Sequence, residues 1–472
     1  MTTEEYLCGL KGRRVLIMGL GVSNRPLARM LLSSRASVAG WDGAPVLDAA
    51  CAELTDAGLP VYLGDEGLDT LLGPEGLWGG LGPEIVFRTP GMLPGHPALL
   101  RATEGGGILT SEMELFFDLC PCPMIGVTGS DGKTTTTTLI ARLLEAAGRK
   151  VWLGGNIGRP LVDLADRMSP EDIAVLELSS FQLMNMTRSP GTAVVTNLAP
   201  NHLDKHRDMA EYTDAKRNIY LRQGPSGRLV LNLDNEITAG FADSACGQVI
   251  GFSRRRRPEE GVWLRGTELV RALPDGRDEV ILDRSELLLP GDHNVENFMA
   301  AICAVGALVP DEVIREVARS FAGVEHRIER VRILDGVTWY NDSIASSPSR
   351  TIAGLRSFSQ KVILIAGGYD KHIPYDVLGP ELAAHVKTLV LTGATGPLIR
   401  EALERTVPEA QRPTVVERTD FSEAVLSARE AAQPGDIVIL SPASASFDHF
   451  KNFAERGRFF KELVLGFEEE EA

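Results

Sequence analysis

The stretch VTGSDGKTTTTTLIARLL, from Val127 to Leu144, decides how the middle of the chain is interpreted. The apolar segment MIGVTG leads into a turn with glycines at positions 129 and 132, and a helical pattern begins near Lys133. Backbone N–H groups of such a loop, together with the helix N-terminus, face a phosphate group. The pattern therefore predicts a nucleotide loop in which Lys133 reaches the β- and γ-phosphates and the Thr134 hydroxyl binds Mg²⁺.

This loop is a variant of the common nucleotide-binding loop. The common pattern has a glycine five residues before its second glycine, and here Val127 occupies that position. The strand before the loop and the helix after it still favour nucleotide binding over a coincidental turn. The residues predicted to surround the nucleotide phosphates are Gly129, Ser130, Asp131, Gly132, Lys133, Thr134 and Thr135.

A magnesium nucleotide needs an acid near the loop, and DIAVLELSSFQL (172–183) supplies one. Glu177 is the one acid inside the apolar run of this predicted strand. A carboxylate is costly to bury unless it is paired or binds a metal. We therefore predict that Glu177 is a metal ligand, with a structural hydrogen bond as the alternative.

The chain divides into three predicted segments, 1–119, 120–325 and 326–472. In the first, RRVLIMGLGVSNRPLARMLLSSRASVAGWD reads as strand, glycine turn, helix and strand. Gly19 and Gly21 occupy two of the three glycine positions of a dinucleotide fingerprint, Asn24 occupies the third, and Asp42 ends the second strand. This predicts a Rossmann-like nucleotide or phosphate site, against the alternative of a glycine turn that serves only close packing.

The other two segments also have an α/β pattern. In the third, KVILIAGGYDK, TLVLTG and DIVILSPASASFD are apolar strands that run into Gly- or Ser-rich loops, which predicts a parallel sheet with ligands beyond its carboxyl ends. Residues 225–290 of the second segment read as a turn-rich β region. The predicted fold class is α/β with three domains.

Composition narrows the range of partners and the compartment. The formal net charge of −16 argues against nucleic acid or an anionic membrane as the main partner, and the basic run SRRRRP (253–258) reads as a solvated loop. The N-terminus has the pattern of neither a signal peptide nor a membrane span. Six cysteines without zinc-like spacing read as free thiols of a reducing compartment, so we predict a cytoplasmic protein.

His202 and Lys216 lie in NHLDKHRDMAEYTDAKRNIY, after a predicted strand and on the helix that follows it. Residue type and spacing alone leave their roles open. A lone histidine is often structural, and lysine is common on helix surfaces.

A resemblance to a known family joins these motifs. GVTGSDGKTTTT, GGNIG, LELSSFQL, NLAPNHLDKH, AKRNIY, GDHNVENFMAA, VEHRIE and LSPASASFDHFKNFAERG occur in the order seen in Mur ligases, and the chain resembles this family over essentially its whole length. The resemblance implies a Rossmann-like UDP-binding domain, a P-loop-type central ATPase domain and a Rossmann-like C-terminal domain for the incoming amino acid.

The resemblance also implies a reaction. ATP phosphorylates the carboxylate of UDP-N-acetylmuramoyl-L-alanine, and the amine of D-glutamate attacks the acyl phosphate to give an amide, ADP and phosphate. SSFQL and SPASASFDHFKNF favour D-glutamate addition, and the DNPR motif expected of the meso-diaminopimelate-adding relative is absent from the sequence. Implied partners are these small molecules alone, with neither nucleic acid nor membrane, and the implied state is a monomer.

The family motifs assign further site residues. Two Mg²⁺ ions are implied, one near Thr134 and Glu177 and the other near His202 and a carbamoylated Lys216, with Lys133 completing the catalytic set. The implied ATP contacts outside the loop are Asn294, Asn297, Arg327 and Asp342. The implied contacts of the UDP substrate are Gly21, Val22, Ser23, Asp42, Asn156 and Ser179. The implied contacts of D-glutamate are Lys371, Ser446 and Phe453.

One departure from the family pattern affects the amino-acid site. Many members read NDSKAT where this chain reads NDSIAS, so Ile344 replaces a lysine. We expect Arg350 or Lys371 to supply the missing cation, or Lys371 and backbone N–H groups to suffice. Two alternatives remain open: a Mur-type or folylpolyglutamate-type ligase for another amino acid, and a nucleotide-binding partner protein that has lost ligation.

Overall fold

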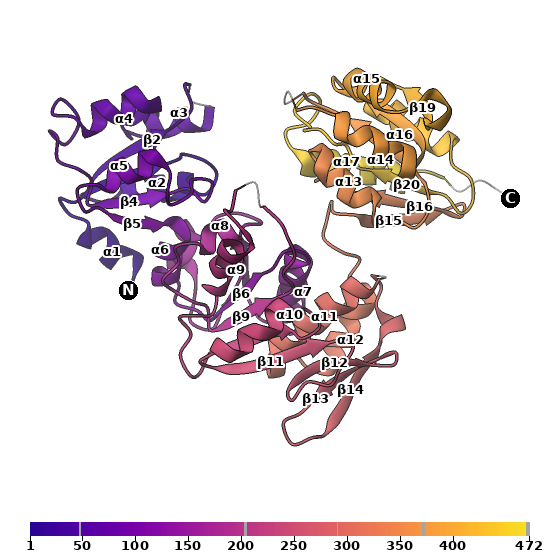
Figure 1. The fold of residues 1–472 in the computed structure, drawn as a ribbon, viewed down its shortest axis with the longest axis horizontal. Helices are drawn as coiled ribbons and strands as arrows, with labels where there is room; N and C mark the ends of the chain where they lie inside the picture. The colour runs from indigo at the N-terminus through magenta and orange to yellow at the C-terminus, as the bar shows by residue number, and fades with distance from the viewer. Residues whose placement is uncertain (47–48, 203–204, 290, 371–372, 469–472) are drawn as a thin grey trace. The chain divides into compact units, whose positions relative to one another are not determined.

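The computed structural model describes residues 1–46, 49–202, 205–289, 291–370 and 373–468. The chain forms two compact units, Met1–Phe321 and Ala322–Ala472, which together hold three β-sheets (Figure 1). Each sheet lies within one of the three predicted segments, so the predicted α/β class with three sheets is confirmed. The segment boundaries themselves stay predictions.

The first sheet has the parallel strand order β3-β2-β1-β4-β5. Its central strand β1 is almost wholly buried because the sheet carries helices on both faces, as a Rossmann-like fold requires (Figure 1). The elements are α1 (Thr3–Gly9), β1 (Arg14–Met18), α2 (Asn24–Leu32), β2 (Ser37–Asp42), α3 (Ala49–Asp56), β3 (Val61–Leu63), α4 (Gly64–Leu72), β4 (Ile85–Arg88), α5 (Pro97–Thr103) and β5 (Ile108–Ser111).

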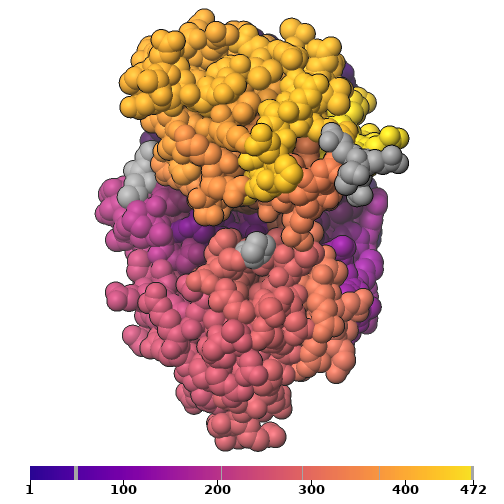
Figure 2. All heavy atoms as spheres, turned by 90° about the vertical axis from the view of Figure 1, so that its right-hand side faces the viewer, coloured from indigo at the N-terminus to yellow at the C-terminus, as the bar shows by residue number. Residues whose placement is uncertain are grey.

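The second sheet has nine strands in the order β14-β13-β12-β11-β10-β9-β6-β8-β7. The strands around the nucleotide loop are parallel, and only the β12–β13 and β13–β14 pairs are antiparallel. The region 225–290 therefore extends the central sheet. Figure 2 shows the end of this region that contains the antiparallel strands, in salmon, as the narrow lower end of the first unit. The strands are β6 (Met124–Thr128), β7 (Val151–Gly155), β8 (Ile173–Glu177), β9 (Thr192–Val195), β10 (Arg228–Asn232), β11 (Gln248–Ser253), β12 (Gly261–Arg265), β13 (Glu268–Ala272) and β14 (Asp278–Asp283).

Helices α7 and α11 form the apolar centre of this central region. Buried side chains of α7, including Leu139 and Leu143, belong to one core cluster with Phe298 and Ile302 of α11. This packing fixes the helix whose N-terminus carries the nucleotide loop. The helices of the region are α6 (Glu112–Leu119), α7 (Lys133–Ala146), α8 (Ser180–Leu183), α9 (Met209–Arg217), α10 (Glu236–Ala239), α11 (Asp292–Val305) and α12 (Asp311–Ser320).

The third sheet has the order β15-β16-β20-β17-β18-β19. The predicted parallel arrangement holds for β16, β20, β17, β18 and β19, whereas β15 is antiparallel to β16. The elements are β15 (Glu329–Leu334), β16 (Val337–Asn341), α13 (Pro348–Leu355), β17 (Val362–Gly367), α14 (Gly379–His385), β18 (Val386–Thr392), α15 (Gly396–Thr406), β19 (Thr414–Glu417), α16 (Phe421–Glu430), β20 (Ile437–Leu440) and α17 (Phe453–Leu465).

The basic run 253–258 and the absence of a predicted membrane span can be compared with the structure. Two of the four arginines of the basic run pair with acids, since Arg254 contacts Asp292 and Glu296, and Arg257 contacts Asp278. Throughout the described part of the chain, no helix has the length and apolar character needed to cross a membrane.

The first residue of α6 is a buried acid that no sequence pattern singled out. The Glu112 side chain is buried, and its Oε1 has no hydrogen-bond partner within the described residues. Burial raises the pKa of this carboxyl to about 8, although a backbone N–H at Val162 opposes the rise. The folded protein therefore holds a proton that the unfolded chain releases.

We predict that Glu112→Gln stabilises the protein most at pH 8. Between the ordinary carboxyl pKa of 4.5 and the folded pKa of about 8, the unfolded chain binds fewer protons, so the parent loses stability as the pH rises. Glutamine does not titrate, so the variant lacks this pH dependence, and its free energy of unfolding should exceed that of the parent by about 1 kcal/mol or more near pH 8. Chemical denaturation from about pH 5 to about pH 8 measures it, with the exposed Glu104→Gln as the control that keeps the parent's slope. Parallel pH dependences of parent and Glu112→Gln would contradict the assignment.

Candidate functional site

The turn between β6 and α7 requires glycine at two positions. Gly129 has φ +152° and Gly132 has φ +74°, both in the region that side chains rarely adopt. A Cβ atom would lie 1.9 Å from Thr196 Oγ1 at Gly129, and 2.3 Å from Asn297 Oδ1 at Gly132. The loop can approach its neighbours this closely only because both residues lack a side chain.

The residues that directly follow β9 hold the loop in place. The backbone N–H of Ser130 donates to Asn197 O, and that of Asp131 donates to Asn197 Oδ1, both at 2.9 Å. The Lys133 ammonium folds back over the loop and donates to the carbonyls of Gly129 and Ser130 at 2.9 and 2.7 Å. A cation and the amino end of α7 thus converge on the space predicted for phosphate.

Glu177 lies at the end of β8 and is 2% exposed. Its Oε2 accepts a hydrogen bond from Thr134 Oγ1 at 2.7 Å, and its Oε1 accepts one from Asn156 Nδ2 at 2.7 Å. The structure therefore brings together three predicted site residues, from α7, from just after β7 and from β8. Carboxylate and hydroxyl oxygens are the donors that Mg²⁺ prefers, so the pair Thr134 and Glu177 fits a magnesium nucleotide.

Lys216 projects from α9 into the same region and is 1% exposed. Its Nζ lies 2.9 Å from Gly129 O, 3.2 Å from Thr128 Oγ1 and 4.8 Å from the centre of the Tyr212 ring. Burial, followed by the charge of Lys133, lowers the pKa of the Lys216 amine well below its ordinary range. The amine therefore has a strong tendency to be neutral, which is unusual for lysine.

His202 is exposed and lies near the rings of Tyr212 and Phe181. Its ring centre is 6.5 Å from that of Tyr212 and 5.3 Å from that of Phe181, and its backbone has φ +55°. Within the described residues, no group of three or more His, Cys, Asp or Glu side chains could hold a metal ion. A metal here would need oxygens from the Thr134 hydroxyl, from bound substrates or from a modified lysine.

A small cavity of about 140 Å³ opens beside the nucleotide loop. Asn297, predicted to contact ATP, lines it and donates to Asn294 Oδ1 at 3.3 Å, while Asn294 itself does not line it. The remaining lining residues are Asp131, Gly132, Thr196, Asn197, Phe252, His293 and Glu296. Its position and size suit a base attached to phosphates on the loop.

The glycine turn of the first sheet is also closely tied. Leu20 N donates to Asp42 Oδ2 at 2.8 Å, and Asn24 Nδ2 donates to Gly19 O at 2.8 Å. Asn24 thus uses its amide at the third fingerprint position to hold the turn. Gly21 and Val22 are exposed and Ser23 is partly exposed, so this part of the predicted UDP site faces solvent.

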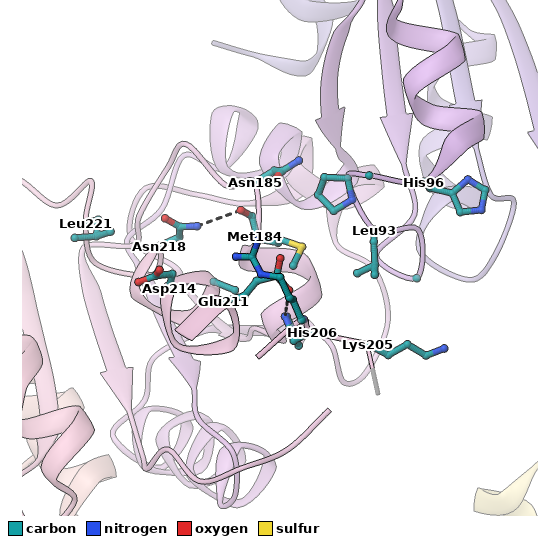
Figure 3. A pocket seen from close by; sticks show the side chains of 15 residues that line it. Leu93, His96, Met184, Asn185, Lys205, His206, Glu211, Asp214, Asn218 and Leu221 are labelled. Atoms are coloured by element: carbon teal, nitrogen blue, oxygen red, sulfur yellow. Dashed lines mark hydrogen bonds and ion pairs between the residues drawn. The ribbon is translucent and has the colours of Figure 1, made fainter. Parts of the chain in front are cut away.

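A larger cavity of about 1080 Å³ lies elsewhere in the first unit (Figure 3). Leu93 and His96, from the loop after β4, line one side, and Asn185, Glu211 and Asp214 line the other. None of the predicted UDP contacts lines it. The segment GMLPGHP (91–97) therefore contributes to a cavity that the sequence motifs did not indicate.

In the second unit, Asp342 is buried at the end of β16. Its Oδ2 accepts from Ser441 Oγ at 2.7 Å and its Oδ1 accepts from Ile328 N at 3.3 Å. Burial raises the pKa of this carboxyl to about 7, and Arg327 and Arg350 partly oppose the rise. Arg327, the other predicted nucleotide contact of this unit, is exposed.

Three of the predicted D-glutamate residues lie in described parts of the second unit, on α13, on α17 and after β20. Ser446 is buried, Phe453 is 38% exposed, and Arg350 Nη1 donates to Ile344 O at 3.2 Å. Arg350 therefore holds the backbone at the position where the family lysine is missing. Lys371 lies outside the described residues.

Arg456 is the site residue that sequence reasoning missed in this unit. Its buried guanidinium donates to Ser343 Oγ and O at 3.0 and 2.9 Å, and to the carbonyls of Ser444 and Ala445 at 3.1 and 2.9 Å. It thus fastens the loop after β16 to the loop that carries Ser446. The motif FKNFAERG contains this arginine, but its contacts are long-range and leave no local pattern.

A phosphate loop that faces a buried acid and a buried lysine defines an enzyme of the nucleotide-dependent class. Two family descriptions match the chain: the Mur ligase middle domain over residues 127–305, and the Mur ligase, glutamate ligase domain over residues 326–444. A UDP-N-acetylmuramoylalanine–D-glutamate ligase of Acetivibrio thermocellus is 50% identical over 472 residues, covering 98% of this chain and 99% of that protein. The chain belongs to the Mur ligase family.

Other similarities agree. The ligase of the same name from Ruminiclostridium cellulolyticum is 47% identical over 469 residues, covering 98% of both proteins. The crystal structure of UDP-N-acetylmuramate-alanine ligase from Thermotoga maritima matches with a TM-score of 0.53 and 17% identity, covering 96% of this chain and 99% of that chain. The latter match shows the shared fold.

We predict that Gly132→Ala weakens ATP binding about tenfold or more, because the new Cβ would displace Asn297 and open the loop. Gly148→Ala is the matched control: Gly148 has φ +78°, follows the same helix, and has open space where the Cβ would be. Both variants carry a similar backbone cost of about 1 kcal/mol, so titration with ATP separates that cost from the loop contact. Equal ATP affinities of the two variants would show that the contact at Gly132 has no role in binding.

Proposed function

We propose that this chain is an ATP-dependent ligase that joins D-glutamate to the alanyl carboxyl of UDP-N-acetylmuramoyl-L-alanine in peptidoglycan synthesis. The observation that carries this conclusion is the full-length identity of 47–50% to ligases of that name. The arrangement of Thr134, Glu177 and Lys216 around the phosphate loop gives the activity a physical basis. The retained loop, acid and lysines also count against a partner protein that has lost ligation.

The chemistry requires charge neutralisation more than proton transfer. The γ-phosphoryl group of ATP is transferred to a carboxylate, so anionic oxygens meet in the transition state. Lys133 and the backbone N–H groups of the loop would stabilise this charge, and the acyl phosphate then gives the D-glutamate amine a carbonyl carbon that it can attack. Attack gives a tetrahedral intermediate that expels phosphate and leaves the amide.

Mur ligases use ATP and Mg²⁺. We propose that one ion is held by Thr134, Glu177 and the nucleotide, and a second by His202 and a carbamoylated Lys216, where Mg²⁺ would neutralise phosphate and carboxylate charge. A carbamate forms when a neutral amine attacks CO₂ and releases a proton, so a lysine with a strongly lowered pKa suits the reaction. The product is an anionic oxygen ligand in a site that otherwise holds two lysines.

We predict that Lys216 of the folded protein takes up labelled CO₂, and that Lys216→Ala loses this label and about a hundredfold or more of its turnover. Carbon-13 NMR of protein equilibrated with labelled bicarbonate detects a carbamate directly. Lys11→Ala, which removes an exposed lysine, should retain both the signal and the activity. An active enzyme without a carbamate signal would rule out the modification.

The substrate contacts in the first unit follow from the same proposal. Gly21, Val22, Ser23 and Asp42 would surround the uridine diphosphate, with Asn156 and Ser179 at the muramoyl-alanine end. Asn156 already bonds to Glu177, so this assignment brings the substrate carboxylate close to the loop. Asn294, Asn297, Arg327 and Asp342 would contact ATP.

For D-glutamate we propose Ser446, Phe453, Arg350 and Lys371 as contacts, with Arg456 as a positioning residue. Among the described residues, Arg456 bonds to none of the predicted D-glutamate contacts, and it would act by holding Ser343 and the Ser444–Ala445 backbone. Lysine cannot reproduce this planar set of donors. The monomeric state and the cytoplasmic location stay predictions.

We predict that Arg456→Lys raises the KM for D-glutamate about tenfold while the KM values for ATP and the UDP substrate change little. Arg458→Lys is the matched control, because Arg458 is exposed on the same helix. Steady-state kinetics with each substrate varied, together with a melting curve, tests the role. A lower melting temperature with an unchanged KM for D-glutamate would show that Arg456 stabilises the fold without positioning the D-glutamate site.

The proposed activity is tested by phosphate release. The protein is given ATP, Mg²⁺ and UDP-N-acetylmuramoyl-L-alanine, with D-glutamate, L-glutamate, L-lysine or meso-diaminopimelate in separate reactions. We expect release with D-glutamate alone. Release with another amino acid would keep ligase chemistry and refute the substrate assignment, and no release with any of them would favour the partner-protein alternative.

A further inference from the structure

Three sulfur atoms meet at the junction between α6 and β6. Cys120 follows α6, one residue separates Cys122 from the start of β6, and their Sγ atoms are 3.4 Å apart. Met168 Sδ lies 3.9 Å from Cys120 Sγ. No disulfide joins the six cysteines, all of which lie in the described part of the chain. The sequence predicted free thiols, and the fold places two of these free thiols in contact.

The two thiols differ in exposure and in acidity. Cys120 is partly exposed, and Cys122 is 5% exposed. The hydrogen bond between them lowers the pKa of the Cys120 thiol and raises that of the Cys122 thiol. An accessible, more acidic thiol beside a buried one is the arrangement of an attacking and a resolving cysteine.

The pair is separate from the nucleotide site. Cys122 precedes the start of β6, whereas the phosphate loop follows its end, so the length of a five-residue strand, roughly 17 Å, lies between them. Asp172, whose charge acts on Cys122, also lies at the amino-terminal end of a strand of this sheet, because it directly precedes β8. No step of the proposed ligation uses either cysteine.

We propose that Cys120 and Cys122 form a redox-active dithiol that small-molecule disulfides convert into an intramolecular disulfide. The Cys120 thiolate attacks one sulfur of the small disulfide, which releases one thiolate and leaves a mixed disulfide on Cys120. The Cys122 thiol loses its proton, attacks Cys120 Sγ and releases the second thiolate. Two protein thiols are oxidised, and one small disulfide is reduced to two thiols.

Proximity and ring size give this reaction its properties. A disulfide needs sulfur atoms about 2.05 Å apart, so the two Sγ atoms must approach by roughly 1.4 Å, which small side-chain rotations allow. The bond would close a short ring around Pro121. Strained and accessible disulfides are the ones that thiols reduce readily, so the modification should be reversible. The oxidised ring would stiffen the link from α6 into the strand that carries the nucleotide loop.

The test uses the native full-length protein in mixtures of reduced and oxidised glutathione. After acid quenching and alkylation, trypsin releases residues 102–133, a peptide that contains only these two cysteines. We expect a form that lacks two hydrogens and carries no alkyl group to increase with oxidised glutathione and to revert with excess reduced glutathione. Lone, exposed Cys8 and Cys246 should form only mixed disulfides under the same conditions.

Variants separate the two roles. Cys122→Ser should stop at the mixed disulfide on Cys120, and Cys120→Ser should leave the buried Cys122 largely unmodified in the folded protein. Using both variants keeps the test valid if one of them fails to fold. The proposal is overturned if the 102–133 peptide carries two alkyl groups at every glutathione ratio, or if its cysteines pair with others in the chain.

Discussion

The buried carboxylate of Glu177 is the constraint on which the site depends. A carboxylate that is 2% exposed would be strongly unfavourable without partners, and the fold supplies Thr134 and Asn156, each at 2.7 Å. Thr134 stands at the start of α7 and Asn156 follows β7, so one acid fixes the relative positions of the phosphate loop and the next strand connection. Neither of these two hydrogen-bond partners carries a charge, and the Lys216 amine, with which Glu177 interacts electrostatically, has a pKa lowered by burial, so a bound cation suits this position.

A second constraint is the gathering of two lysines over a small loop. Lys133 and Lys216 both donate to Gly129 O, and the charge of Lys133 contributes to the lowered pKa of Lys216. Binding of an anion, or conversion of one lysine into an anionic group, relieves this repulsion. The site is therefore suited to phosphate and carboxylate groups. This local basic site occurs in a chain whose formal net charge is −16.

The sequence predicted the parts of this site that have local patterns. The glycines of the loop predicted its position, and the isolation of Glu177 in an apolar strand predicted a functional role for this acid. Contacts between distant segments left no such signal: Asn197 is 66 residues from Asp131, and Arg456 is 113 residues from Ser343. The thiol pair was missed for a different reason, because spacing alone does not reveal that Cys120 and Cys122 point toward each other. Within the fold, the parallel sheets followed from strand and loop patterns, whereas the antiparallel β15 was missed although the sequence carries a hairpin signal. Asp335 and Gly336, both with positive φ, form the two-residue turn that pairs β15 with β16.

The central claim is that the loop, Glu177 and the two lysines activate a carboxylate by phosphorylating it. The direct measurement is isotope transfer from UDP-N-acetylmuramoyl-L-alanine in which both oxygens of the alanyl carboxylate are ¹⁸O, in the presence of ATP, Mg²⁺ and D-glutamate. The account predicts that each phosphate released carries one ¹⁸O atom, because the acyl phosphate loses its bridging oxygen to phosphate when the amide forms. Amide formation with phosphate free of ¹⁸O would contradict it.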